Sequence, residues 1–199
     1  MIVTLAMTPR PPITTVLCLM ACVCVTVLCW GQGTVNFANS PAVFFDGVDR
    51  YVYLDFVGGT RLVGTNYVAE LWYGSDANSL AAIAPPVAPF RDVMPDSVVA
   101  GVWSGDTRTL QGFGSGDVLT LQVKVWDLSL FSTYNQASSS PGAIFGASEA
   151  FSYRVPLAGE ENPIAYTMIN MRAFSLVPEP SGLFVISALL ALLFAFRIM

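Results

Sequence analysis

The sequence contains no histidine, and its four cysteines all lie within the first 29 of its 199 residues. From Gln32 onward no side chain can therefore complete a Ser-His-Asp triad, act as a cysteine nucleophile or form a His/Cys zinc site. There is also no glycine-rich loop of the Walker or dinucleotide-binding type. These absences exclude triad hydrolases, cysteine-dependent enzymes, His/Cys zinc enzymes and the nucleotide-binding enzymes that carry those loops.

Basic residues are scarce between the two ends of the chain. Of the 14 acidic and nine basic residues, only Glu179, Arg10 and Arg197 lie outside residues 32–175. That interval carries 13 acidic and seven basic residues, a net charge of about −6. Because phosphate binding needs a basic patch, we expect no nucleic-acid partner.

The N-terminal 31 residues have the organisation of a secretory signal peptide. Arg10 precedes the apolar stretch Ile13–Trp30, and small residues follow at its end. Cleavage after Gly31 would leave Gln32 as the mature N-terminus, and the general secretion machinery is the expected partner. The cysteines inside this stretch act as small hydrophobes and are no disulfide framework; they are Cys18, Cys22, Cys24 and Cys29. The alternative is a lipoprotein signal, because Leu19–Cys22 loosely resembles a lipoprotein cleavage box.

The C-terminal end carries a second apolar segment. The run Leu183–Phe196 contains no charged residue, and Arg197 follows it directly. Residues 183–198 would be about 24 Å long as a helix, against a hydrocarbon core of about 30 Å. We therefore predict a short transmembrane helix over residues 182–198, held in the inner membrane. Prolines break helices, so Pro178 and Pro180 mark the boundary before it.

This tail resembles the PEP-CTERM sorting signal of Gram-negative bacteria. The resemblance rests on Pro178-Glu179-Pro180, the apolar run and Arg197, which together belong to the region 176–199. It implies processing by an exosortase, a membrane-embedded transpeptidase or protease that removes the tail, followed by sorting to the cell surface or extracellular space. Such tails usually end in several Arg or Lys, whereas this one has Arg197 alone. The alternative is an ordinary C-terminal membrane anchor.

The interval 32–175 reads as one all-β domain. Short apolar and aromatic runs are separated by Gly, Pro, Asn, Asp and Ser, a pattern typical of strands and turns. In Val118–Trp126 the apolar residues alternate strictly with polar ones, which predicts one buried and one exposed face. We expect an antiparallel β-sandwich, jelly-roll or Ig-like, with a β-barrel as the alternative. The strands predicted are Thr34–Ala38, Ala42–Phe45, Arg50–Val57, Asn66–Tyr73, Val98–Trp103, Arg108–Phe113, Val118–Trp126, Phe151–Val155 and Arg172–Val177.

Three segments do not fit the strand pattern. Asn78–Ile83 is compatible with one or two turns of helix, while Pro85–Pro89 and Ser129–Gly142 are expected to be long loops. Loops at the ends of a sandwich commonly carry the binding function. A fainter resemblance, to uncharacterised PEP-CTERM proteins of Verrucomicrobia-like bacteria, rests on four segments of this interval and implies no activity; they are Gly33–Asn39, Ala69–Gly74, Leu121–Asp127 and Phe145–Ser148.

Two tryptophans fall on nominally polar strand faces. Trp126 has the parity of Thr120, Gln122 and Lys124, and Trp72 has that of Glu70. If both indoles are exposed, they form a platform on which a sugar can stack, which would make the domain a carbohydrate-binding module for extracellular polysaccharide. If loops or a neighbouring strand cover them, they are ordinary packing residues.

Carboxylate chemistry is the remaining enzymatic option. A glycosidase needs two Asp or Glu across a sugar, and the candidates are Asp55, Glu70, Asp127 and Glu149. Nothing in the sequence pairs any two of them. Asp46 and Asp49 offer oxygens for calcium, but no EF-hand spacing follows them. We therefore expect no catalytic residue, no metal and no cofactor, and predict an exported, non-enzymatic surface protein.

Overall fold

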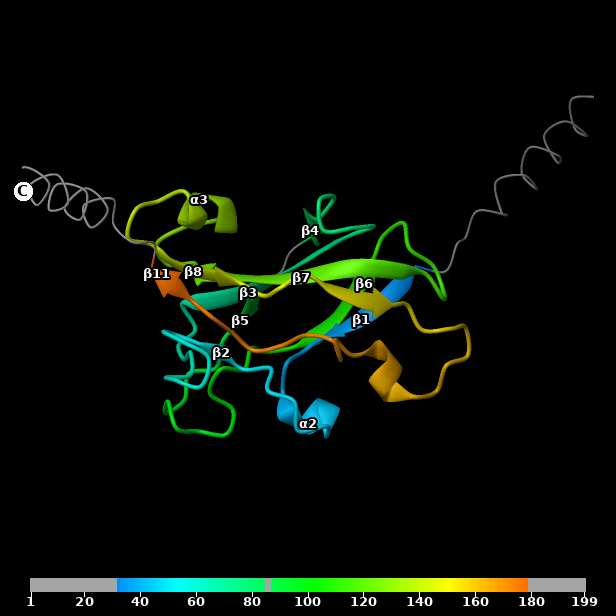
Figure 1. Ribbon diagram of the computed structural model, residues 1–199, viewed down its shortest axis with the longest axis horizontal. Helices are drawn as coiled ribbons and strands as arrows, with labels where there is room; N and C mark the ends of the chain where they lie inside the picture. The colour runs from blue at the N-terminus through cyan, green and yellow to red at the C-terminus, as the bar shows by residue number, and fades with distance from the viewer. Residues whose placement is uncertain (1–31, 85–86, 179–199) are drawn as a thin grey trace, which may run out of the picture. The chain divides into compact units, whose positions relative to one another are not determined.

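The computed structural model describes residues 32–84 and 87–178, which are mostly strand with few helical turns (Figure 1). The strands are β1 (Gly33–Phe37), β2 (Val52–Tyr53), β3 (Tyr67–Gly74), β4 (Ala81–Ala82), β5 (Ala88–Pro89), β6 (Asp106–Leu110), β7 (Val118–Asp127), β8 (Ile144–Ala147), β9 (Phe151–Arg154), β10 (Phe174–Ser175) and β11 (Val177–Pro178). The helical segments are α2 (Pro41–Phe44), α3 (Tyr134–Ser138) and the 3-10 turn η1 (Pro163–Tyr166).

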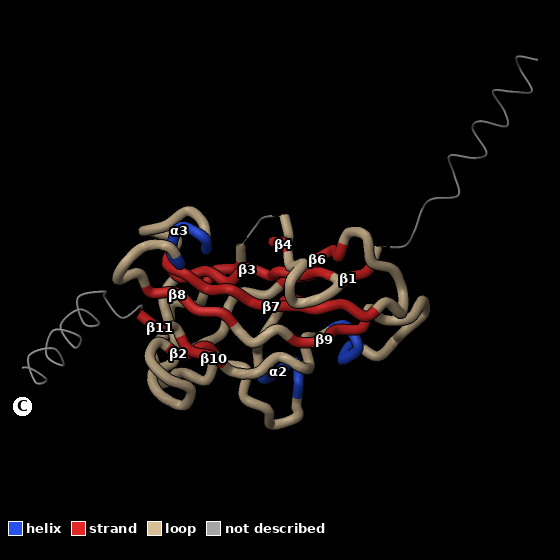
Figure 2. Tube along the Cα trace, turned by 45° about the horizontal axis from the view of Figure 1, so that its top comes forward, coloured by secondary structure: helices blue, strands red, loops and turns tan. Residues whose placement is uncertain are grey.

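The longest strand, β7, organises the larger sheet. It pairs antiparallel with β3 along one edge, and with β8 and β9 in succession along the other (Figure 2). The strand order is β11-β8-β7-β3-β4, with β5 also paired to β3. A single register therefore fixes which side chains of β7 and β3 share a face, because partners directly opposite point the same way.

The face of β7 that was predicted to be buried is buried. Leu119, Leu121, Val123 and Val125 belong to the main hydrophobic core, and Leu121 is 0% exposed. The alternate residues from Thr120 to Lys124 are half-buried on the other face. The alternation read from the sequence therefore gives the correct inward side.

Two small sheets contribute to the same core. Strands β1 and β6 pair antiparallel, and β10 and β2 pair parallel. Their buried side chains, among them Val35, Phe37, Val52 and Phe174, lie in one cluster with the inward residues of β7 and β3. The sheets that the structure describes are open, so the barrel alternative is wrong. This arrangement is consistent with a β-sandwich, and the parallel pair is a departure from the all-antiparallel expectation.

A buried amide ties three segments together. Asn39 is almost fully buried, and its Nδ2 donates to the carbonyl oxygens of Arg50 (2.9 Å) and Gly101 (2.8 Å). Its Oδ1 accepts from the backbone N–H of Trp103 at 3.2 Å. The side chain therefore satisfies the buried Arg50 carbonyl and Trp103 N–H and gives the Gly101 carbonyl a second donor beside the Val52 N–H, as buried polar groups require.

Three predicted elements are wrong. Ala42–Phe45 was expected to be a strand and is helix α2, which starts at Pro41, a residue favoured in the first helical turn. Val98–Trp103 is mainly turns, with a single bridge from Trp103 to Phe90. Asn78–Ile83, considered compatible with one or two turns of helix, instead contains β4, which pairs with Trp72 and Tyr73.

Several boundaries and elements also differ from the prediction. Only Val52–Tyr53 of the predicted strand Arg50–Val57 is paired as a named strand, and the strand expected at Arg108–Phe113 is Asp106–Leu110. Strand β8 and helix α3 were not predicted. The folded domain also extends past Ser175, because Val177 and Pro178 pair with β8.

Candidate functional site

Trp126 is not available for ligand stacking. It lies on the outer face of β7, but helix α3 covers that face, and the indole is 1% exposed. Tyr134 packs edge-on against its ring at a centroid distance of 6.2 Å, and its Nε1–H donates to the carbonyl oxygen of Phe131 at 2.9 Å. The alternative of covered packing is therefore correct for Trp126, and a platform that needs both indoles exposed is wrong.

Trp72 remains half-buried on the same outer face, inside a polar cluster. Its Nε1–H donates to Glu70 Oε2 at 2.7 Å, and Glu70 lies directly across the β3–β7 pair from Lys124. The Lys124 Nζ is 3.4 Å from the centroid of the Trp72 ring and 4.9 Å from that of Tyr134. We call these four residues the Lys124 cluster.

In the Lys124 cluster, Glu70 and Lys124 carry opposite charges, and each charge opposes the pKa shift that burial causes in the other. Burial raises the pKa of Glu70, while the Trp72 hydrogen bond and the Lys124 charge act in the opposite direction. Burial lowers the pKa of Lys124, and the Glu70 charge opposes that shift. The Lys124 ammonium lies over both aromatic rings, so the cation that interacts with their faces is a side chain of the domain itself. The cluster is a means of stabilising the outer face of the sheet.

The four candidate carboxylates lie on separate segments. Glu70 belongs to the Lys124 cluster on β3, and Glu149 lies in the connection between β8 and β9. Asp127 is buried and accepts hydrogen bonds from Asn66 and Ser129. Asp55 Oδ1 accepts two backbone N–H groups of its own loop. Three of the four, Glu70, Asp55 and Asp127, therefore already accept hydrogen bonds from donors of the domain.

A groove of about 380 Å³ runs beside helix α2, lined by the turn 45–49 together with Tyr51, Tyr53 and Arg61. The two aspartates that were considered for calcium lie in it. The Asp46 carboxylate accepts hydrogen bonds from both terminal nitrogens of Arg50, from Nη1 to Oδ1 at 2.7 Å and from Nη2 to Oδ2 at 2.6 Å. Asp49 accepts from the Tyr51 backbone N–H and from the Tyr53 hydroxyl. Both carboxylates are thus bonded to protein donors, and the described residues contain no cluster of three or more metal-ligating side chains.

Asp46 and Arg50 form an ion pair that should make stability depend on acidity. The hydrogen bond from Arg50 holds the pKa of Asp46 well below its ordinary value of 3.8. A carboxyl whose pKa is lower in the folded state stabilises the fold above its unfolded pKa, and this contribution is lost as the pH falls through and below about 4. The pair should therefore stabilise the domain at pH 7 and progressively fail under acid.

We expect Asp46→Asn to reduce the difference in unfolding free energy between pH 7 and pH 3, because the variant no longer has a carboxylate to protonate. Urea denaturation at the two pH values measures this difference. Asp92→Asn, which removes an exposed carboxylate without touching the ion pair, is the matched control. A pH dependence in Asp46→Asn as steep as that of the wild type would contradict the assignment.

The processing residues fall mostly beyond the described chain. Gln32 is the first described residue and is exposed, and Pro178 is the last. Gly31, Glu179, Pro180 and Arg197 lie outside the described residues, as do the predicted signal peptide and transmembrane helix. Within residues 32–84 and 87–178, no helix has the length and apolar character needed to cross a bilayer.

The sequence did not indicate the Lys124 cluster as a unit. Glu70 and Trp72 were noticed for their shared parity, but Lys124 comes from another strand and Tyr134 from an unpredicted helix. Knowing the β3–β7 register would have placed Lys124 beside them, since Glu70 and Lys124 are direct partners.

No family model, no curated protein and no solved structure matches this chain.

Proposed function

We propose that this chain is an exported protein that is held in the inner membrane by its C-terminal segment and then sorted to the cell surface or extracellular matrix. The observation that carries the proposal is where the first and last described strands lie. Strand β1 begins at Gly33, two residues after the expected cleavage site, and β11 ends at Pro178, the first residue of the Pro-Glu-Pro motif. The described strands thus lie between the two apolar segments of the sequence.

The domain itself is proposed to be a non-enzymatic β-sandwich, with jelly-roll or Ig-like connections as the finer prediction. Asp127, at the end of β7, accepts a hydrogen bond from Asn66, and Asp55 accepts one from the Phe56 N–H of its own loop. Trp126, one of the two indoles considered for glycan binding, is buried under α3. These contacts favour a structural or surface role over glycosidase chemistry and over sugar binding on a Trp72–Trp126 pair.

The expected partners follow from the two ends. The general secretion machinery would move the chain across the inner membrane, and an exosortase would act on the tail. Extracellular polysaccharide is a further expected partner at the final location. No nucleic-acid contact is proposed, because the domain is acidic and its charges are scattered.

The proposal predicts a mature N-terminus at Gln32. Signal peptidases need small residues just before the cut, and Gly31 with Cys29 meets that need. Mass spectrometry of the exported protein measures the terminus, and Gly31→Leu should leave the leader attached. Gln32→Ala, on the other side of the bond, should still be cleaved. Recovery of Met1 or a lipidated Cys22 on the exported wild-type chain would overturn the processing scheme.

A further inference from the structure

The parallel pair of strands places a loop beside the point where the chain leaves the domain. Phe174 and Ser175 of β10 pair with Val52 and Tyr53 of β2, and the Leu176 N–H donates to the Tyr53 carbonyl at 2.8 Å. Parallel strands run in the same direction, so the segments that follow β2 and β10 continue toward the same end of the domain. There β2 enters the turn 54–60, and β10 leads into β11 and Pro178.

Two more connections reach this end. Strand β11 runs antiparallel to β8, with Pro178 opposite Ile144, so it ends where the segment 128–143 enters β8. The segment 92–98 joins through hydrogen bonds from Arg61 to the Ser97 carbonyl and from the Tyr51 hydroxyl to the Val98 carbonyl. Figures 1 and 2 show these loops grouped where β11 ends. We call segments 54–60, 92–98 and 128–130, together with Pro178, the exit end.

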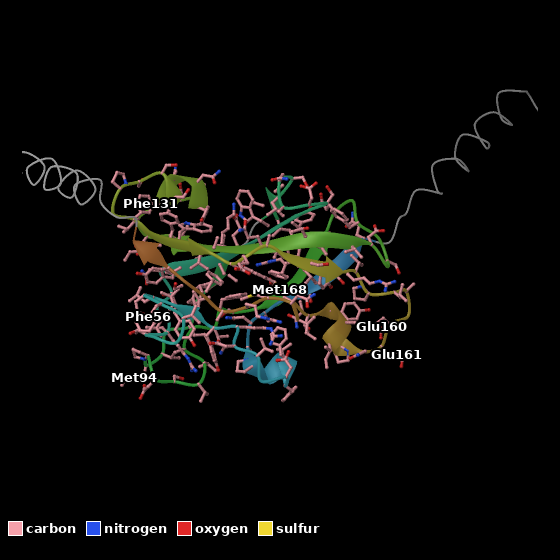
Figure 3. The ribbon with its side chains drawn as sticks, viewed as in Figure 1. Phe56, Met94, Phe131, Glu160, Glu161 and Met168 are labelled. Atoms are coloured by element: carbon pink, nitrogen blue, oxygen red, sulfur yellow. The ribbon has the colours of Figure 1, made fainter. Side chains whose placement is uncertain are left out.

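The exit end has most of the exposed apolar side chains. Twelve large hydrophobic residues are exposed among the described residues, and seven of them lie on its three segments: Leu54, Phe56, Val57, Met94, Val98, Leu128 and Leu130. Figure 3 places Phe56 and Met94 on the opposite side of the domain from Glu160 and Glu161. Concentrated apolar exposure marks a surface that contacts another protein or a membrane.

Backbone hydrogen bonds hold two of these side chains outward. The Gly59 N–H donates to the Phe56 carbonyl at 2.9 Å, and Gly58 has φ of +93°, as a type II turn requires at its third residue. Asp55 Oδ1 accepts from the backbone N–H groups of Phe56 and Thr60. The turn that carries Phe56 is therefore fixed. Met94 likewise starts a turn, closed by the Ser97 N–H at 3.0 Å.

The sequence beyond Pro178 indicates what covers this surface. Four residues, 179–182, separate Pro178 from the apolar run Leu183–Phe196. Four fully extended residues span at most about 14 Å, and each headgroup layer is about 6 Å thick. If the run lies in a bilayer, the exit end is held at the surface of that same bilayer.

We propose that the exit end is a membrane-docking surface, whose apolar turn tips insert at the headgroup boundary of the bilayer that holds the C-terminal segment. This inference rests on the membrane anchoring in the proposed function. It adds the orientation of the domain: β7 stands with Asp127 toward the membrane and Val118 away from it. The ten residues of β7 separate the two ends by about 30 Å.

Lipid-borne quenchers can test this orientation on the exported chain with its leader removed and its tail retained, purified from membranes. That chain has no cysteine of its own, so Phe56→Cys, Met94→Cys and Val118→Cys each give one site for a fluorescent label. Val118 is the matched control, since it is 62% exposed and Phe56 is 63% exposed. The labelled chains are reconstituted into phosphatidylcholine vesicles that contain headgroup-region quenchers. We expect the labels at 56 and 94 to be quenched severalfold more than the label at 118.

Flotation of the same vesicles separates the possible failures. If the chain floats with the vesicles and the three labels are quenched equally, the docking surface is wrong while the anchor stands. If the labels at 56 and 94 are shielded from water but not quenched by lipid, a second copy or another protein covers them, and the proposal is overturned. If the chain does not float with the vesicles, both the membrane anchor and the docking surface are wrong.

Discussion

Leu121→Asp should leave the domain without a stable fold. Leu121 is fully buried in the middle of β7, among the inward side chains of the main hydrophobic core. An isolated carboxylate in an apolar core is strongly unfavourable, and whole domains are stable by only about 5–15 kcal/mol. The milder change Leu121→Ala should reduce the unfolding free energy by about 2–5 kcal/mol.

Thr120→Asp is the control for this prediction. Thr120 is the preceding residue of the same strand, half-buried on the outer face, and we expect it to tolerate the charge with a change of about 1 kcal/mol. Far-UV circular dichroism and urea denaturation compare the two variants. Equal damage, or greater damage from Thr120→Asp, would reverse the inward and outward faces of β7.

Asn39→Ala should be the next most destabilising change. It removes the hydrogen-bond partners of the Arg50 carbonyl and the Trp103 N–H, while the Gly101 carbonyl keeps a bond from the Val52 N–H. Two buried backbone groups left unsatisfied cost about 1–3 kcal/mol each, so we expect a total loss of about 2–6 kcal/mol.

The control for Asn39 is Asn135→Ala, on the exposed surface of α3. Alanine is the better helix former, so this variant should match the wild type within about 0.5 kcal/mol. Urea denaturation of both variants measures the difference. A loss below about 1 kcal/mol for Asn39→Ala would mean that water or another group replaces its side chain.

The sequence predicts the two long strands because Val118–Trp126 keeps its period-2 alternation and Asn66–Tyr73 is a long, mainly apolar and aromatic run. Val118–Trp126 and Asn66–Tyr73 coincide closely with β7 and β3. The failures are short segments where tertiary contacts decide. Ala42–Phe45 is an apolar run of four residues that fits a strand or a helix equally. Strand β8 was missed because Gly146 within it is a residue typical of turns. The strand needs glycine there, since a Cβ would approach the Ser175 carbonyl oxygen to 2.6 Å.

The candidate site was only partly predictable for a related reason. Parity identified the outer-face positions of Trp72 and Trp126 correctly. It could not show that α3 covers Trp126, since Ser129–Gly142 has the composition of a loop and the helix within it is five residues long. The exit end could not be predicted either, because its three segments are brought together by long-range contacts: the pairing of β10 with β2, the pairing of β11 with β8 and the bonds of Arg61 and Tyr51.

The most direct test of the account is the location of a chain in which Pro178, Glu179 and Pro180 are replaced by alanine. The apolar run should still insert by its hydrophobicity, while release needs a recognised motif. We predict that cell fractionation finds this variant exported but retained in the inner membrane, with the wild type and the control Ser181→Ala at the surface or in the medium. Arrival of the alanine variant there at the wild-type level would contradict tail-dependent sorting.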